Sequence, residues 1–218
     1  MAAQPDGPGP WRAGPPNTLE VRRIRNAQRC CISGNQTEPD LDEESHDVGD
    51  FDSPPNASQS GGGTGIDTGD TRLLYAFWKG GLLSTGQNLA CNSGNDACIA
   101  FTELNVSGYP GSISTVNDFA YQTANVDYYY PAVDVNSAGD KSMVFSRSSS
   151  SEFIGTSFIG IPSSSFCTNC VNGPETVLQA GSSNYVSLDL AERNRWGDYF
   201  GASADPDGTD VWPIHHLL

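Results

Sequence analysis

The chain has 218 residues and a formal net charge of −15, with 26 aspartates and glutamates against 11 lysines and arginines. Nucleic acids and anionic membranes bind basic surfaces, so this balance disfavours both as partners. No apolar run is long enough for a membrane span or a signal peptide, and residues 1–16 are rich in proline and glycine instead. The length is sufficient for one domain with a hydrophobic core.

Residues 1–50 are predicted to form a disordered or irregular extension. The first 17 residues contain five prolines and three glycines, a composition typical of chain that cannot build a core. The basic run at 19–29 is interpreted as one solvated strand or as an anion-binding patch. The acidic run at 38–52 is interpreted as a solvated loop, with cation binding as the alternative.

From residue 51 onward the sequence predicts repeated β-hairpins. Asp70, Asp127 and Asp198 each precede a short run of apolar or small residues, and each run leads to a turn that contains glycine. The three aspartates are separated by 57 and 71 residues. Periods near 50, with several short strands in each, are typical of radial β arrays, and unequal periods indicate loops of different length.

Each period has room for four strands, and the repeats are expected near 70–122 and 128–187, with a partial one from 196. In the second repeat the strands are expected at 130–135, 141–147, 153–161 and 176–179. Their continuous apolar character predicts burial on both faces. The favoured fold is all-β, with β-propeller-like blades of four antiparallel strands; a β-sandwich is the alternative. The best candidate for a helix, at 186–194, is short and unconvincing.

Two motifs resemble a known family. The run Tyr-Tyr-Tyr-Pro-Ala-Val-Asp-Val at 128–135 and the run Arg-Trp-Gly-Asp-Tyr-Phe-Gly-Ala-Ser-Ala-Asp-Pro-Asp-Gly at 195–208 resemble secreted bacterial β-propeller proteins of sialidase-like architecture. The resemblance spans roughly residues 51–212 and implies fold and export more than chemistry. Two and a half blades are too few to close a ring of about four to eight. We therefore expect a piece of a longer protein, with self-association through open blade edges.

Repeat symmetry brings equivalent strand starts to one rim of such a structure, which defines the candidate site. The candidate catalytic residues are Asp127, Tyr128, Arg195 and Asp198, and the candidate ligand-binding residues are Asp70, Arg72, Arg147, Trp196 and Tyr199. Carboxylates, guanidinium groups and phenols that converge in this way can bind a sugar, a cation or an anionic substrate. The alternative is that each aspartate caps the start of its own strand.

The leading functional interpretation is an exported binding or surface-scaffold module whose partner is carbohydrate or a cell-surface protein. The alternative is a sialidase-like glycoside hydrolase that acts on an anionic sugar. Such an enzyme needs an arginine cluster, a tyrosine nucleophile and an acid/base carboxylate. Arg72, Arg147 and Arg195 with Tyr128 or Tyr199 supply these residue types, but the chain lacks the family's Arg-Ile-Pro motif and its Ser-x-Asp-x-Gly-x-x-Trp box.

No cofactor is certain from the sequence, and calcium is the leading candidate. Asp205, Asp207 and Asp210 alternate around a glycine turn as calcium ligands do, although the bidentate glutamate of a full calcium loop is missing and a plain hairpin turn explains the pattern as well. A calcium-stabilised adhesion module is therefore a third function to consider.

Short polar loops separate two pairs of cysteines, Cys91 from Cys98 and Cys167 from Cys170. This spacing predicts two local disulfides, which are typical of extracellular proteins. A zinc site of all four cysteines is the alternative.

Overall fold

The computed structural model describes residues 17–25, 40–163, 174–197 and 200–214, and this part of the chain is all-β. The chain divides into two compact units, residues 1–50 and residues 51–218. No helix in the described ranges has the length and apolar character needed to cross a membrane.

Unit 1 contains an antiparallel hairpin, where the sequence indicated irregular chain. Strand β1 (Thr18–Arg25) pairs with strand β2 (Asp40–Asp47) over their whole length. Arg23 lies opposite Asp42, and its Nη2 is 2.8 Å from the Asp42 Oδ2. The basic and the acidic runs are therefore complementary strands, because opposite charges that face each other across a ladder stabilise the pair. Each run taken alone resembles a solvated segment, so the pairing was missed.

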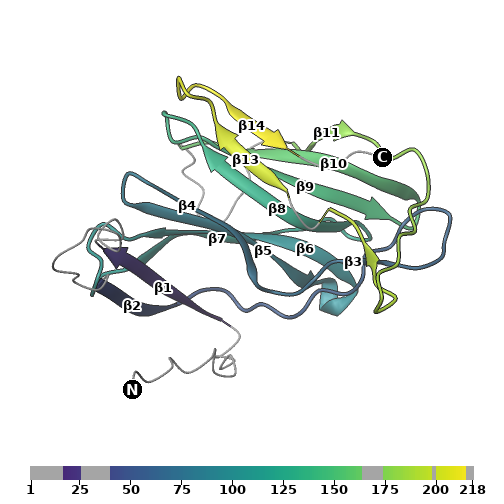
Figure 1. Cartoon of the computed structure of the whole chain (residues 1–218), viewed down its shortest axis with the longest axis horizontal. Coiled ribbons are helices and arrows are strands. Elements are labelled where there is room, and N and C mark those ends of the chain that lie inside the picture. The colour runs from purple at the N-terminus through teal and green to yellow at the C-terminus, as the bar shows by residue number, and fades with distance from the viewer. Residues whose placement is uncertain (1–16, 26–39, 164–173, 198–199, 215–218) are drawn as a thin grey trace, which may run out of the picture. The chain divides into compact units, whose positions relative to one another are not determined.

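Unit 2 contains two four-stranded antiparallel sheets, each a meander in chain order (Figure 1). Sheet 1 consists of β4 (Leu73–Lys79), β5 (Leu82–Cys91), β6 (Asp96–Asn105) and β7 (Ser114–Tyr121). Sheet 2 consists of β8 (Asp127–Val135), β9 (Lys141–Ser149), β10 (Glu152–Ile161) and β11 (Thr176–Gln179). Two-stranded pairs complete the unit: β3 (Ile66–Asp67) with β12 (Asn194–Arg195), and β13 (Gly201–Ala204) with β14 (Val211–Ile214).

The predicted all-β fold of four-stranded antiparallel blades is confirmed. All four strands expected in the second repeat are present, and β8 to β11 begin and end within a few residues of the predicted bounds. The segment 186–194 is not helical; an isolated bridge joins Leu188 to Asn194 instead. One short 3-10 turn, Asn92–Gly94, joins β5 to β6.

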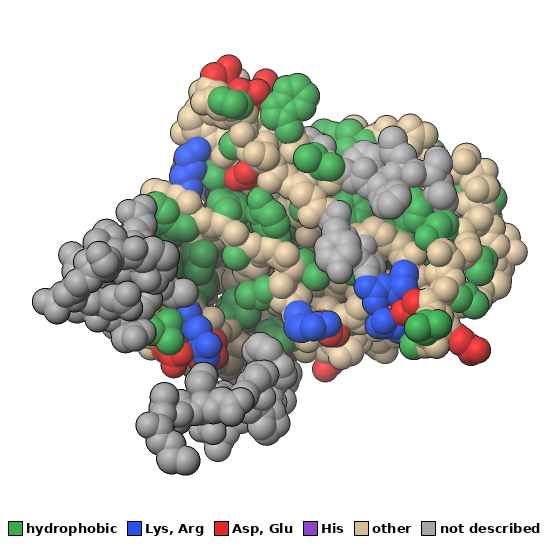
Figure 2. Space-filling model, in the orientation of Figure 1, with side chains coloured by type: hydrophobic (Ala, Val, Ile, Leu, Met, Phe, Trp, Pro, Cys, Tyr) green, Lys and Arg blue, Asp and Glu red, His purple; other side chains and the backbone are tan. Residues whose placement is uncertain are grey.

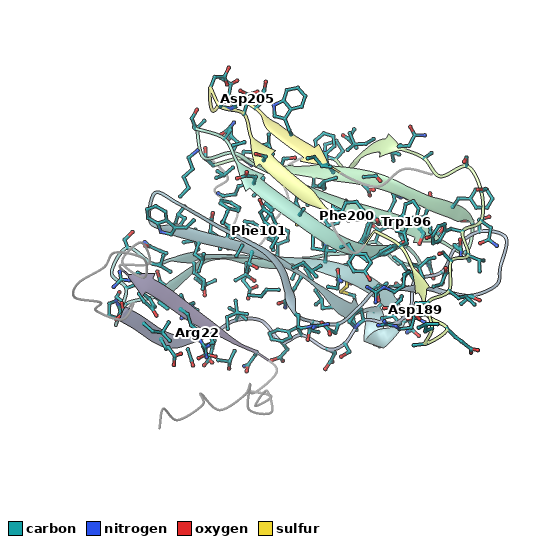
Figure 3. All side chains as sticks on the ribbon, in the orientation of Figure 1. Arg22, Phe101, Asp189, Trp196, Phe200 and Asp205 are labelled. Atoms are coloured by element: carbon teal, nitrogen blue, oxygen red, sulfur yellow. A yellow bond between two sulfur atoms is a disulfide. The ribbon has the colours of Figure 1, made fainter. Side chains whose placement is uncertain are left out.

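Sheet 2 is the middle one of three layers. One of its faces packs on sheet 1, where Met143 and Phe145 meet Phe101 and Phe119 in the main core, and Figure 3 shows Phe101 between the two sheets. On the other face, Val144 packs with Ala202 of the β13–β14 hairpin. A simple two-sheet sandwich buries one face of each sheet. Sheet 2 is instead covered on both faces, as in a stack of successive layers.

The turns of the three hairpins lie in a row at one end of unit 2 (Figure 1). The Nζ of Lys79, the last residue of β4 before the β4–β5 turn, donates to the backbone oxygen of Asn136 in the β8–β9 turn at 2.8 Å. The backbone N–H of Ser137 in that second turn donates to the oxygen of Gly208 in the β13–β14 turn at 2.6 Å. Equivalent turns of the three repeats are thus hydrogen-bonded neighbours.

The leading strands of the repeats are also neighbours. The hydroxyl of Tyr75 in β4 donates to the backbone oxygen of Ala202 in β13 at 2.8 Å. The backbone N–H of Ala204 in β13 donates to the Asp134 carboxylate of β8 at 2.7 Å. Strands β4, β8 and β13 therefore converge, as the first strands of blades do around an axis.

The predicted disulfide between Cys91 and Cys98 is present and links β5 to β6. The other predicted disulfide, Cys167 with Cys170, lies outside the described residues. Replacing Cys91 and Cys98 together by alanine should lower the free energy of unfolding by about 2–3 kcal/mol, because the bond closes a short loop in the unfolded chain. Thermal unfolding should show a midpoint lower by roughly 5–10 °C. An unchanged midpoint would contradict this prediction.

Candidate functional site

The candidate site is built where the chain returns to the start of unit 2. Strand β12 pairs in parallel with β3, which places Arg195 opposite Asp67. Asn194 lies between two arginines and is buried, and its side chain donates to the backbone oxygen of Tyr185 at 2.9 Å. Successive side chains of an extended strand point to opposite sides. Fixing Asn194 inward therefore directs Arg193 and Arg195 to the other side.

These two arginines line a pocket of about 550 Å³ at the leading ends of β4 and β8. On the face drawn in Figure 2, basic side chains gather beside acidic ones over the part of unit 2 that contains β3. The pocket has the size of an ordinary small-molecule site. Its lining residues are Asp67, Gly69, Asp70, Arg72, Leu73, Leu74, Tyr130, Arg193 and Arg195.

Three arginines and two aspartates line the pocket, so its lining has a net charge of +1 in a chain whose net charge is −15. The Nε of Arg72 lies 2.8 Å from both Asp70 oxygens, an arrangement that does not use the two terminal NH₂ groups. The hydrogen bond from Arg72 holds the pKa of Asp70 below its usual range, although partial burial opposes this shift. Both side chains therefore carry full charge at neutral pH.

Arg193 is positioned by acidic side chains on two segments. Its Nη2 is 2.7 Å from Asp189 in its own loop, and its Nε is 3.5 Å from Asp67. The hydrogen bond and charge of Asp189 raise the pKa of Arg193, and the Arg193 backbone N–H lowers the pKa of Asp189. Figure 3 shows Asp189 in the loop next to β3. The loop from 189 to 195 is therefore tied to the β3 side of the pocket.

Tyr130 is a buried lining residue of the pocket and is held in an unusual backbone conformation. Its φ is +56°, within the irregular register between Tyr129 and Ala132, and its N–H donates to the side-chain oxygen of Asn88 at 2.7 Å. Its hydroxyl donates to the backbone oxygen of Asp67 at 2.8 Å. Burial raises the pKa of Tyr130, so its phenol keeps the proton. The Tyr130 side chain is therefore held in one position, with its hydroxyl as a hydrogen-bond donor and its ring as part of the pocket lining.

Three of the sequence-predicted residues, Asp70, Arg72 and Arg195, come together in this pocket. Asp127 does not line it: the Asp127 carboxylate is buried and accepts hydrogen bonds from the backbone N–H groups of Ser58 and Ala97, at 2.7 Å and 2.8 Å. Burial raises the pKa of Asp127, although these two hydrogen bonds lower it in part. Asp127 therefore has a structural role of another kind than capping its own strand: it ties the start of β8 to the backbone of two distant segments.

The other predicted residues are placed elsewhere. Tyr128 is buried, and its hydroxyl donates to Glu175 at 2.9 Å. Arg147 pairs with Glu175 at 2.6 Å and with Glu152 at 2.7 Å. The indole N–H of Trp196 donates to the Ser146 hydroxyl at 3.1 Å, inside the protein. Asp198 and Tyr199 lie outside the described residues.

Sequence reasoning missed Asp67, Tyr130 and Arg193. The alternation Arg193-Asn194-Arg195 carried a usable signal, because a polar residue between two arginines in an extended segment puts both arginines on one side. Nothing in the local sequence indicated the parallel pairing that brings Asp67 to Arg195. The positive φ of Tyr130 also had no signal, since a bulky residue rarely adopts it.

The predicted calcium turn lies at the opposite end of unit 2 from Asp189 (Figure 3). Asp205 accepts hydrogen bonds from the Asp207 N–H and from the Trp212 indole, and Asp207 accepts from the N–H and hydroxyl of Thr209. Among the described residues, no group of three or more His, Cys, Asp or Glu side chains is placed to hold a metal ion. Calcium binding by Asp205, Asp207 and Asp210 stays a prediction.

No protein-family model, curated protein or solved structure matches this chain. The function must therefore be argued from the geometry of the pocket.

Proposed function

We propose that this chain is a binding module for a carboxylate-bearing carbohydrate, held in the pocket between β4, β8 and β12. The supporting observation is that Arg72, Arg193 and Arg195 line one pocket in a strongly acidic chain. Guanidinium groups match a carboxylate with two parallel hydrogen bonds, which makes arginine the preferred partner of such anions. The three arginines gathered here also give an anion a partner that the rest of this acidic surface does not offer.

The apolar part of the lining supports a sugar as the rest of the ligand. Leu73 and Leu74 are 44% and 40% exposed at the start of β4, and Tyr130 lines the same pocket. Sugar rings present C–H faces to such surfaces and hydroxyl groups to nearby carboxylates. Asp67 and Asp70 supply those acceptors. A free inorganic anion would make no use of the apolar residues.

The state of Tyr130 favours binding over hydrolysis. A tyrosine nucleophile needs a phenol that gives up its proton readily. Burial raises the pKa of Tyr130, and its hydroxyl is engaged as a donor to the Asp67 backbone. Tyr128, one of the two nucleophiles that the sequence suggested, has its pKa raised by burial as well and does not line the pocket. The sialidase-like hydrolase is therefore the weaker alternative.

The proposal includes export and a propeller-like context. Structural disulfides persist in oxidising compartments, and Cys91–Cys98 is one. Stacked four-stranded blades with converging first strands agree with the resemblance to secreted bacterial β-propeller proteins of sialidase-like architecture. In this context the pocket lies at the rim where the leading strands begin, as ligand sites of closed radial folds do.

Replacing Arg72 by alanine should weaken binding of a carboxylated glycan about 10- to 100-fold, because one charge-assisted hydrogen-bonding group is lost. A glycan array with sialylated, uronate-containing and neutral glycans identifies the probe, and calorimetry then measures its Kd. Arg72 is 85% exposed, so the variant should fold normally. The matched control is Arg22→Ala, which removes an exposed, paired arginine from unit 1. Absence of binding to every carboxylated glycan, or equal affinity in both variants, would overturn the proposal.

A further inference from the structure

A layer of three polar side chains closes the core between the two sheets near the hairpin turns. Alternate residues of β6, β7 and β9 face this core: Phe101, Phe119 and Met143 lie in it. Two positions away on the same strands, toward the hairpin turns, are Glu103, Asn117 and Lys141. The Glu103 carboxylate bridges the other two groups. Its Oε1 is 2.8 Å from the Nζ of Lys141, and its Oε2 accepts from the Nδ2 of Asn117 at 2.9 Å.

This arrangement is more buried than an ordinary ion pair. The side chains of Glu103 and Lys141 are 1% and 6% exposed. Desolvation of two charges offsets much of their attraction, so a buried ion pair is weak evidence for stability alone. Lys141 is also one of only two lysines in the chain. An amine and a primary amide that both contact one carboxylate form a set that can react.

We propose that Lys141 and Asn117 form an intramolecular isopeptide bond, with Glu103 as the proton carrier. The bond would join the Nζ of Lys141 in sheet 2 to the Cγ of Asn117 in sheet 1. The two reacting groups are bound to the two oxygens of one carboxylate, so folding itself brings them together. The cross-link covalently ties neighbouring blades.

The reaction balances without any oxidant or co-reactant. The Lys141 ammonium gives a proton to Glu103, and the free amine attacks the Asn117 Cγ. A bond forms between Nζ and Cγ, and the bond between Cγ and Nδ2 breaks. The Nδ2 that leaves is the nitrogen that already donates to Glu103, so the carboxyl group can return protons to it. Nitrogen departs as ammonium, and a neutral amide replaces a buried cation.

The surroundings of Glu103 suit this chemistry. The hydroxyl of Ser84 donates to the Glu103 Oε1 at 3.1 Å, while Asn117 binds the other oxygen. This hydrogen bond helps to hold the carboxylate in place. A second pocket, of about 280 Å³, reaches Glu103 and Lys141 past Phe77 and the exposed Gly80. Ammonium can leave by this route, while the apolar lining keeps the amine poorly solvated until it reacts.

The direct test is the mass of the intact full-length protein after reduction of its disulfides. The isopeptide bond lowers the mass by one ammonia molecule relative to the sequence. It also blocks trypsin after Lys141, so the denatured protein should give a single peptide 80–147 in place of 80–141 and 142–147. Fragmentation of that peptide should join Lys141 to Asn117. A mass equal to that of the sequence, or ammonia loss at any other asparagine, would overturn the proposal.

Three variants make the test specific. Asn117→Ala should have the mass of its sequence, should be cleaved after Lys141 and should lower the thermal midpoint by roughly 6–12 °C, as loss of a cross-link that closes a short loop does. Asn117→Asp should still cross-link but should lose one water molecule instead of ammonia. Lys79→Arg changes the other lysine beside the pocket and should leave the ammonia loss intact. Cross-linking in Asn117→Ala would overturn the assignment.

Discussion

Replacing Asp127 by alanine should lower the free energy of unfolding by about 2–6 kcal/mol and should leave the ligand pocket chemically unchanged. Asp127 accepts hydrogen bonds from the backbone N–H groups of Ser58 and Ala97 and is 4% exposed. Alanine leaves both buried donors without an acceptor, at a cost of about 1–3 kcal/mol each. Urea unfolding followed by tryptophan fluorescence measures the loss. Asp207→Ala is the matched control, because its carboxylate serves an exposed turn.

The unfolding free energy lost on replacing Asp127 by alanine should decrease as the pH rises. Burial raises the pKa of Asp127 above 3.8, its value in the unfolded chain. A group with a raised pKa contributes its full stability below the unfolded value and loses it as the pH rises through the folded value. The difference in unfolding free energy between the wild type and Asp127→Ala should therefore be larger at pH 4 than at pH 7. A difference that grows toward pH 7 would show that the carboxylate is stabilised as an anion.

The contrast between Asp127 and Asp70 shows why equivalent positions in the sequence need not have equivalent roles in the structure. Both aspartates stand at strand starts, as their spacing indicated. Asp127 begins β8, in a sheet that is covered on both faces, so its carboxylate is buried and bonded to backbone amides. Asp70 precedes β4, which is largely exposed, and its carboxylate pairs with Arg72 beside the pocket. Sequence equivalence does not reveal which layer a strand occupies.

The strands themselves were predictable because their signals are local. In sheet 2, β-branched and aromatic runs bounded by glycine and asparagine turns sufficed to locate β8 to β11. The pairing of β3 with β12 is long-range and only two residues wide, and the hairpin of unit 1 joins a basic run to a distant acidic one. Such pairings depend on complementarity between segments, which a reading in chain order does not capture.

Arg147 should prove structural. Replacing it by methionine should lower the free energy of unfolding by about 3–5 kcal/mol, because Glu175 would remain buried without its cation. Glu175 is 12% exposed and accepts from the Tyr128 hydroxyl at 2.9 Å, while Arg147 lies 2.6 Å from its other oxygen. Burial by itself lowers the pKa of Arg147, but the hydrogen bonds to Glu152 and Glu175 raise that pKa by more. The guanidinium therefore stays charged at every accessible pH.

A double-mutant cycle separates this role from the ligand-binding role that the sequence suggested. Glu175→Gln keeps an acceptor for Tyr128 and removes the charge, so the double variant with Arg147→Met should be more stable than Arg147→Met alone, with a coupling of about 2 kcal/mol. Arg22→Met, in an exposed pair, should hardly move the unfolding midpoint. Binding of the glycan probe by folded Arg147→Met should equal that of the wild type. Loss of binding with full stability would instead place Arg147 at the ligand and would contradict its assignment to the ion-pair network with Glu152 and Glu175.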